Sequence, residues 1–101
     1  MKSKVDYSEG GLVELQVRSV SPKVADSVSS RIMDLFEKSR TSGPEALKSK
    51  AGTLFKFSRP AKIHSRKIVI QNFTGSDVQA IEELFLPSLV HLDFKVIDSN
   101  A

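Results

Sequence analysis

The most distinctive chemical pattern in this chain is a group of lysines and arginines near its middle. The segment from Ala46 to Ser76 holds seven of the 15 basic residues and no aspartate or glutamate, so the rest of the chain has 8 basic and 12 acidic residues. The seven are Lys48, Lys50, Lys56, Arg59, Lys62, Arg66 and Lys67. Such a segregated positive segment is typical of a phosphate-binding surface, because each neutralised phosphate releases condensed counterions. The alternative is an ordinary solvated surface, although such surfaces usually mix both signs of charge.

Other residue types that carry chemistry do not form a catalytic pattern. The chain has no cysteine, and its two histidines, His64 and His91, are too few for a histidine-based metal site. Glu82 and Glu83 are adjacent, and neighbours on a helix do not share a face. A glycine-rich phosphate loop, paired histidines on a helix and a nucleophile elbow are all missing from the sequence. We therefore expect no enzyme activity, cofactor, metal or small-molecule substrate.

Phe55 and Phe57, which lie two residues apart inside the basic segment, have two interpretations. Aromatic side chains on a sheet can stack on RNA bases. Core packing is the favoured interpretation, because a small domain with six phenylalanines and no tryptophan needs them inside. The glycine-aromatic cluster of RNA-recognition modules is missing from the strand that carries Ile68 to Ile70, which disfavours that fold.

Length and composition allow one compact domain with one core, since the chain has 101 residues and is 40% hydrophobic. We expect a flexible N-terminal lead over residues 1–11, the domain over residues 12–97 and a polar tail over residues 98–101. The longest apolar runs are far shorter than the roughly 20 residues that cross a bilayer, and the N-terminus lacks the apolar core of a secretory signal. These features predict a soluble intracellular protein without membrane contact.

Hydrophobic periodicity predicts the elements that would position the basic segment. Alternating apolar residues indicate strands, and apolar residues three to four apart indicate helices. The predicted order is strand, helix, strand, strand, helix, strand, over Leu12 to Val20, Ser21 to about Arg40, Thr53 to Arg59, Ile63 to Gln71, Thr74 to about Pro87, and Val90 to Ile97. Glu45 to Gly52 is expected to form a helical turn or a loose loop, after Gly43 and Pro44 end the first helix.

This order predicts an α+β protein of the ferredoxin-like, split βαβ (βαββαβ) type, with two helices on one face of a four-stranded antiparallel sheet. The apolar residues expected to form most of the core are Leu15, Val17, Ile32, Phe36, Ile68, Ile70, Ile81, Leu84, Leu92 and Phe94. The basic segment would then form a hairpin and the connection that precedes it, and connections are where binding residues concentrate.

The second half of the chain resembles the small-subunit ribosomal protein S-ten (uS-ten) family. That family has an H-x-R-x-[IV]-x-I stretch, then a T-x-x-x-V-x-A-[LI]-x-x-L-x-L helix and a final V-x-[VIL]-x-[IVL] strand. Matching residues without a gap are His64 to Ile70, then Thr74, Val78, Ala80, Ile81, Leu84 and Leu86, then Val90, Leu92 and Phe94. In the first half, Leu12 to Pro44 is similar to the family's strand, helix and K-x-T-G-x-G-P ending.

The resemblance implies a ribosomal protein without enzyme activity that binds ribosomal RNA and neighbouring small-subunit proteins. With the basic segment, it implies RNA contacts at Lys48, Lys50, Lys56, Arg59, Lys62, His64, Arg66 and Lys67. The family's P-L-P-T is replaced by Ala46 to Lys50, and its long loop shrinks to Ser58 to Ile63. These departures suggest a remodelled ribosome such as a mitochondrial one, with a cytoplasmic one left open.

A protein-interaction module is the alternative from a different functional class. A ferredoxin-like domain can assemble by adding a strand of a partner to an exposed sheet edge. Salt separates the two hypotheses, because RNA binding weakens as salt rises whereas apolar assembly holds or strengthens.

Overall fold

The computed structural model describes residues 11–55, 59–84 and 90–99, and it begins with the central strand β1 (Gly11–Ser19). Along β1, every second side chain is buried, with Val13, Leu15 and Val17 pointing into the core. This is the alternation that the sequence predicts for a half-buried strand. The N-terminal lead predicted over residues 1–11 lies almost wholly outside the described residues.

Helix α1 (Pro22–Met33) follows directly and is shorter than predicted. Ser21 caps it, because the backbone N–H of Val24 donates to Ser21 Oγ at 3.3 Å. The helix was expected to run to about Arg40, but residues Lys38–Arg40 form a separate 3₁₀ turn, η1. Arg40 donates to the backbone oxygens of Gln71 and Asn72, at 3.2 and 2.7 Å. These contacts hold residue 40 beside the end of strand β4 (Ala61–Ile70). A helix that continued to Arg40 would carry this residue away from the sheet.

The second strand predicted over Thr53 to Arg59 was wrong. Strand β2 (Thr41–Ala46) instead contains the Gly43 and Pro44 that were expected only to end a helix. It is an edge strand with a register irregularity between Ser42 and Glu45, and proline, which has no N–H to donate, is tolerated at such places. Residues 53–55 are not in a strand, and residues 56–58 lie outside the described part. Residues 41–46 therefore form a strand because they pair with β4, although glycine and proline have low strand propensity.

Three elements complete the second half of the chain. Strand β3 (Lys50–Gly52) pairs with the start of β4 (Ala61–Ile70), so the segment expected to be a turn or loop contains a short strand. Helix α2 (Gly75–Glu82) begins at the predicted cap, where the backbone N–H of Thr74 donates to Asp77 Oδ2 at 3.0 Å. The predicted end of this helix at Pro87 lies outside the described residues. Strand β5 (Val90–Ser99) is the last element.

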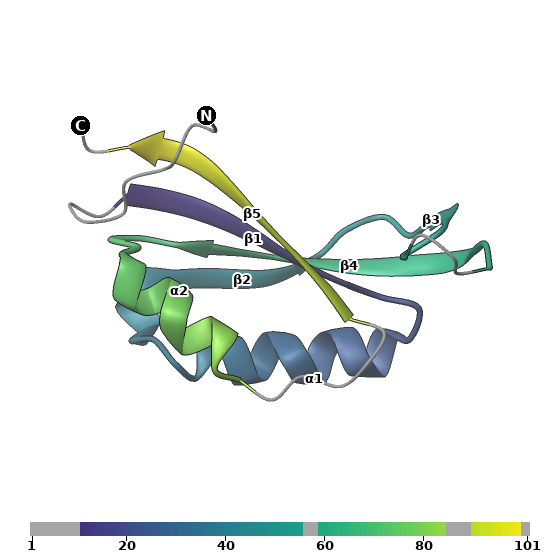
Figure 1. The fold of residues 1–101 in the computed structure, drawn as a ribbon, viewed down its shortest axis with the longest axis horizontal. Helices are drawn as coiled ribbons and strands as arrows, with labels where there is room; N and C mark the ends of the chain where they lie inside the picture. The colour runs from purple at the N-terminus through teal and green to yellow at the C-terminus, as the bar shows by residue number, and fades with distance from the viewer. Residues whose placement is uncertain (1–10, 56–58, 85–89, 100–101) are drawn as a thin grey trace.

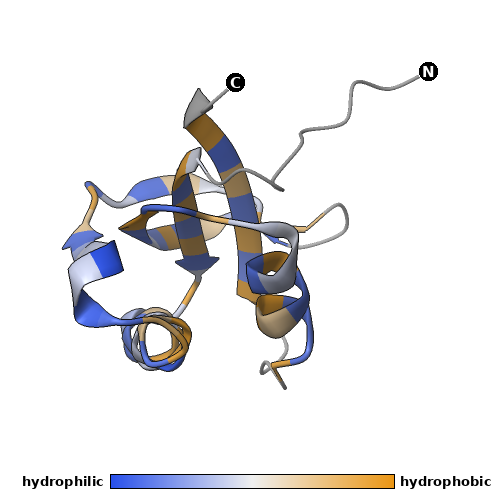
Figure 2. Cartoon of the chain, turned by 90° about the vertical axis from the view of Figure 1, so that its left-hand side faces the viewer, coloured by the Kyte–Doolittle hydropathy of each residue, from blue (hydrophilic) through white to orange (hydrophobic). Residues whose placement is uncertain are grey.

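The structure is an α+β fold with two helices and an antiparallel sheet of five strands, not four. The strand path is β2-β4-β1-β5, and β3 pairs with β4 off this path. Register places Leu15 opposite Ile68 and Phe94. Both helices lie on the same side of the sheet in Figure 1, and the strands show alternating hydrophobic and hydrophilic bands in Figure 2. Among the residues that the structure describes, no helix covers the other face of the sheet.

The core lies between the sheet and the two helices. Its buried members are Val13, Leu15, Val17, Val28, Ile32, Phe36, Ile68, Ile70, Phe73 and Ile81. Most of the predicted core is confirmed, with Leu84 and Leu92 packed at its margin. Phe94 was predicted to be buried, but it is 38% exposed, because β5 is an edge strand. Its ring still contacts the core through Phe73, at 5.9 Å between centroids.

Candidate nucleic-acid interface

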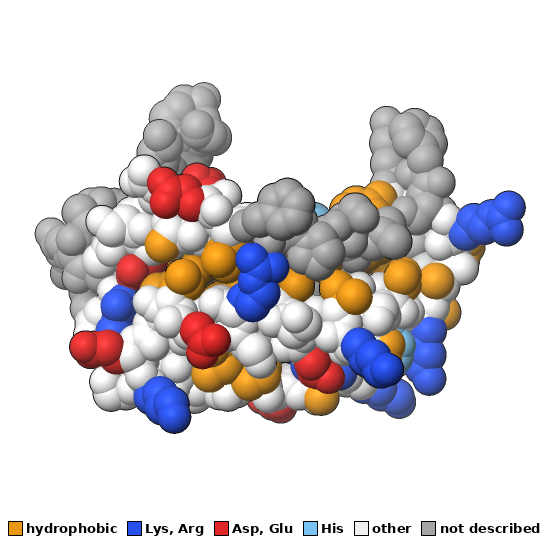
Figure 3. Space-filling model, turned by 90° about the horizontal axis from the view of Figure 1, so that it is seen from below, with side chains coloured by type: hydrophobic (Ala, Val, Ile, Leu, Met, Phe, Trp, Pro, Cys, Tyr) orange, Lys and Arg blue, Asp and Glu red, His pale blue; other side chains and the backbone are white. Residues whose placement is uncertain are grey.

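Four predicted RNA-binding side chains, which we call the cationic end, are exposed around the pairing of β3 with β4. They are Lys48, Lys50, Arg59 and Lys62. Within the described residues, none of the four lies in an ion pair with a carboxylate. Figure 3 shows the helix side, where lysine and arginine side chains gather toward this end of the molecule and most acidic side chains lie toward the other. Unpaired exposed cations are the groups that bind phosphates most readily.

Two other predicted residues, Arg66 and Lys67, are neutralised by acids from outside the basic segment. The Arg66 side chain is only 12% exposed, and its Nε lies 2.6 Å from Asp26 Oδ1 on α1. Lys67 Nζ lies 3.3 Å from Glu45 Oε1 on β2. Because neighbouring side chains of a strand point to opposite faces, Arg66 and Lys67 also do not share a surface. The basic segment therefore does not form one continuous patch.

The remaining two predicted residues are His64 and Lys56. His64 is half-buried, and its Nδ1 lies 3.1 Å from Ser49 Oγ. A serine that contacts a histidine can act as a nucleophile when a third group, usually a carboxylate, orients the histidine. In the described part of the chain, no carboxylate contacts His64. We interpret the contact as a tie between β4 and the linker of residues 47–49. Lys56 lies outside the described residues.

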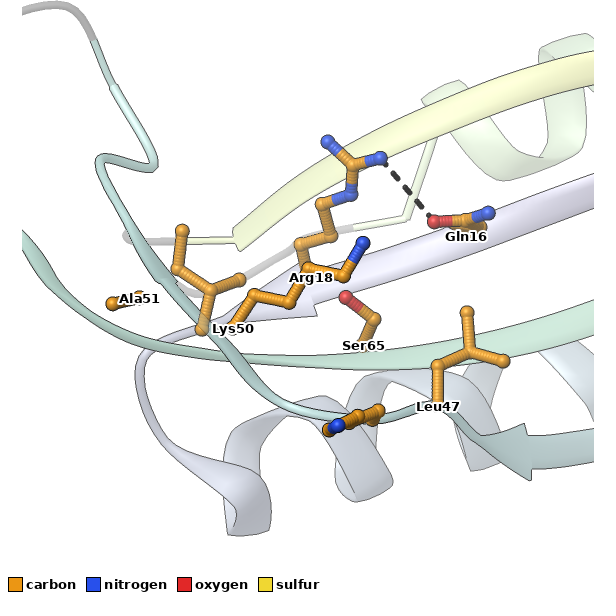
Figure 4. A pocket seen from close by; sticks show the side chains of 8 residues that line it. Gln16, Arg18, Leu47, Lys50, Ala51 and Ser65 are labelled. Carbon is orange, nitrogen blue, oxygen red and sulfur yellow. Dashed lines mark hydrogen bonds between the residues drawn. The ribbon is translucent and has the colours of Figure 1, made fainter.

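A hollow of about 540 Å³ opens on the uncovered face of the sheet, beside the cationic end. Its floor comes from β1 and β4, through Gln16, Arg18, Ile63 and Ser65. Its wall comes from the linker and β3, through Leu47, Lys48, Lys50 and Ala51. Figure 4 shows the labelled side chains of these two groups around the same space. The hollow thus combines cations, neutral polar groups and aliphatic side chains.

A short polar network holds the floor of the hollow. Arg18 Nη2 donates to Gln16 Oε1 at 3.3 Å, the contact dashed in Figure 4, and Gln16 Nε2 donates to Glu14 Oε2 at 2.8 Å. Arg18 Nη1 also lies 3.1 Å from Asp93 Oδ2 on β5. Because its guanidinium carries five donor hydrogens, Arg18 keeps donors for a further acceptor while these contacts fix its position.

Sequence reasoning missed the residues of the floor. The alternation of β1 does place Gln16 and Arg18 on its polar face, which was the available signal. What brings them to the basic segment is the register, in which Arg18 lies opposite Ser65 and Gln16 opposite Lys67. That register became known only from the structure. The floor adds one cation, Arg18, that the predicted set lacked.

Phe55 is a correction to the predicted core. Its side chain is 37% exposed, and its ring meets His91 edge-on at 6.4 Å between centroids. It therefore lies at the surface, where packing and ligand contact are both open to it. Phe57, with which it was paired in the sequence argument, lies outside the described residues.

Comparison of the sequence with models of protein families finds no match, and comparison with the curated proteins finds none. In the residues that the structure describes, no helix is long and apolar enough to span a membrane. The same residues include no group of three or more histidine, aspartate or glutamate side chains placed to hold a metal ion.

Proposed function

We propose that this protein binds RNA through the cationic end, as a structural component of a small ribosomal subunit that catalyses no reaction. The observation that carries the proposal is the set of four exposed cations, Lys48, Lys50, Arg59 and Lys62, without carboxylate partners among the described residues. Electrostatic contact of this kind supplies affinity and position on the phosphate backbone, whereas sequence selection requires contacts to bases.

The ribosomal part of the proposal is supported by the uS-ten resemblance across His64 to Ile70 and α2. For the fold, we assign the path β2-β4-β1-β5 to the ferredoxin-like arrangement and treat β3 as an added strand on β4. This assignment replaces the predicted second strand with β2, and it leaves the order of crossovers unchanged. We further propose ribosomal RNA and adjacent small-subunit proteins as partners, in a remodelled ribosome of the mitochondrial kind.

Salt-dependent binding to a fragment of small-subunit ribosomal RNA tests the proposal. The double variant Lys48→Ala with Lys50→Ala should lower affinity and reduce the magnitude of the log–log salt slope by about one to two units. The matched control removes equal charge at Lys23 and Lys38, both exposed and distant in sequence from the cationic end. We expect the control to bind nearly as the parent protein does. Equal loss in both variants would reduce the effect to net charge and contradict docking at the cationic end.

One observation favours assembly with another protein as a second candidate. Strand β5 forms an edge of the sheet over ten residues, and its Phe94 and Ile97 side chains are 38% and 47% exposed. Long edges with apolar side chains are sites of strand addition. If partner binding holds or strengthens as salt rises, and the lysine variants leave it unchanged, this second function is the better account.

A further inference from the structure

The hollow beside the cationic end has the size and the lining of a ligand site. Its volume of about 540 Å³ lies within the range of roughly 300–1,000 Å³ that small-molecule sites occupy. Its lining divides into three chemistries, which lie side by side (Figure 4). Leu47 and Ile63 are aliphatic, Gln16 and Ser65 are neutral hydrogen-bonding groups, and the cations are Arg18, Lys48 and Lys50.

A nucleotide presents the complement of these three chemistries in one unit. Its base offers two apolar faces and a polar edge, and its phosphate offers a negative charge. We propose that the hollow receives one unstacked nucleotide of a single-stranded RNA, an inference that rests on the proposed RNA binding and deepens it. The base contacts Leu47 and Ile63, and its edge faces Gln16 and Ser65. The adjoining phosphates face Lys48 and Lys50.

The side chains that line the hollow favour an unstacked nucleotide over two other anionic ligands, an acidic peptide and duplex RNA. An acidic peptide would use Arg18 and the lysines, but its carboxylates would leave the aliphatic wall without a partner. Duplex RNA keeps its bases stacked inside the helix, and proteins contact it mainly through phosphates and 2′-hydroxyls. Only an unstacked base inserts between Leu47 and Ile63. The hollow therefore favours single strands, loops and bulges over helices.

The hollow is formed before any ligand arrives. The backbone N–H of Leu47 donates to the backbone oxygen of Ser65 at 3.0 Å, and Ser49 contacts His64 at 3.1 Å. Both contacts fix the linker against β4, which forms the floor. A preformed site avoids the entropic cost of ordering a loop on binding. The tie through Ser49 and His64 thus serves recognition although neither residue lines the hollow.

Filling the hollow without changing charge tests the proposal. Ser65 points into the hollow from β4, opposite Arg18 of β1, so Ser65→Phe places a ring in the space where the base would lie. The probe is a nine-nucleotide single-stranded RNA with one 2-aminopurine, compared with the duplex of the same sequence. Parent protein should unstack the 2-aminopurine and raise its fluorescence. Ser65→Phe should leave the fluorescence unchanged and weaken single-strand binding about tenfold, at the lower end for stacked bases because the base packs on aliphatic side chains. Duplex binding and the salt slope should not change.

A second variant and a competitor keep the outcomes separate. Leu47→Ser removes the aliphatic wall and should also abolish the fluorescence change. If neither variant alters single-strand binding while the lysine pair does, the nucleotide site is wrong and the proposed RNA binding stands. If the parent binds neither RNA, the proposed function itself fails. Free adenosine monophosphate is added at about 1 mM, which half-fills a site whose Kd is about 1 mM, or about −4 kcal/mol of binding free energy. It should not displace the oligonucleotide. If adenosine monophosphate displaces the oligonucleotide, the hollow is a site for free mononucleotides, and the proposal that it receives a nucleotide of an RNA strand is wrong.

Discussion

The two halves of strand β4 are used differently by the molecule. Its second half pairs with β1 and β2, and there Ile68 and Ile70 are fully buried against the helices. Its first three residues, Ala61–Ile63, pair with β3 and carry the exposed Lys62. The proposed function thus assigns stability to one half of this strand and recognition to the other. Substitutions in the second half should change the free energy of unfolding, and substitutions around the first should change RNA affinity.

The largest expected effect on stability is in the buried half. Ile70→Ala removes a fully buried side chain that lies opposite Val13 on β1. The lost burial and the residual cavity should lower the unfolding free energy by about 2–5 kcal/mol, measured by denaturant titration. RNA affinity of the folded fraction should not change. A decrease in the unfolding free energy of less than about 1 kcal/mol would mean that the second half of β4 is not part of the tightly packed hydrophobic core.

A backbone position beside the buried half should have the next largest effect. Gly43 in β2 has φ +108°, and a Cβ there would lie 2.6 Å from the backbone oxygen of Lys67. Gly43→Ala should therefore cost about 1–3 kcal/mol through strain and a steric clash. Gly75→Ala is the matched control, because a Cβ at Gly75 meets nothing within 4 Å. If both substitutions destabilise equally, β2 is not held against β4 as described.

The junction between the two halves should show a smaller effect. Asp26→Asn removes the partner of Arg66, but the Asp26 side chain is 62% exposed. The Arg66 side chain is only 12% exposed, but the asparagine amide oxygen can still accept from its Nε–H. The unfolding free energy should therefore fall by about 1 kcal/mol, the upper end for exposed ion pairs, and by less in high salt. Glu37→Gln removes an equal charge from an exposed side chain outside any ion pair among the described residues. A loss of the same size in Glu37→Gln would assign the effect to net charge.

The smallest effect on stability belongs to the cationic end. Lys48→Ala with Lys50→Ala removes two exposed side chains without ion-pair partners among the described residues. Surface substitutions of this kind usually change the unfolding free energy by no more than about 0.5 kcal/mol. Thermal unfolding of the double variant should therefore coincide with that of the parent. A clear drop in the midpoint would show that these lysines also hold β3 in place.

The sequence predicted the elements whose pattern is local and periodic. β1, α2 and β5 begin within a residue or two of their expected positions, because alternation or a cap marks each start. β2 was missed because Gly43 and Pro44 oppose strand formation locally, and pairing with β4 overrides them. The end of α1 was missed because the long-range contacts of Arg40 decide where the chain turns.

The candidate site was only partly predictable for the same physical reason. The composition of the basic segment alone singled out Lys48, Lys50, Arg59 and Lys62, and the structure shows that these four side chains are exposed. Asp26 and Glu45 lie outside the basic segment, so sequence counting could not show that they neutralise Arg66 and Lys67. The hollow depends on register between β1 and β4 and on the linker passing beside them, and neither is encoded in a local pattern.

An RNA titration followed by amide chemical shifts tests the separation along β4 most directly. With a single-stranded ribosomal RNA fragment, the account predicts that shift changes concentrate at residues 47–51 and 61–65 and at Gln16 and Arg18 in β1. The amides of Ile68, Ile70 and α2 should move little. The largest changes on α1 and α2, or changes spread evenly over the sheet, would contradict the claim that RNA docks at the cationic end.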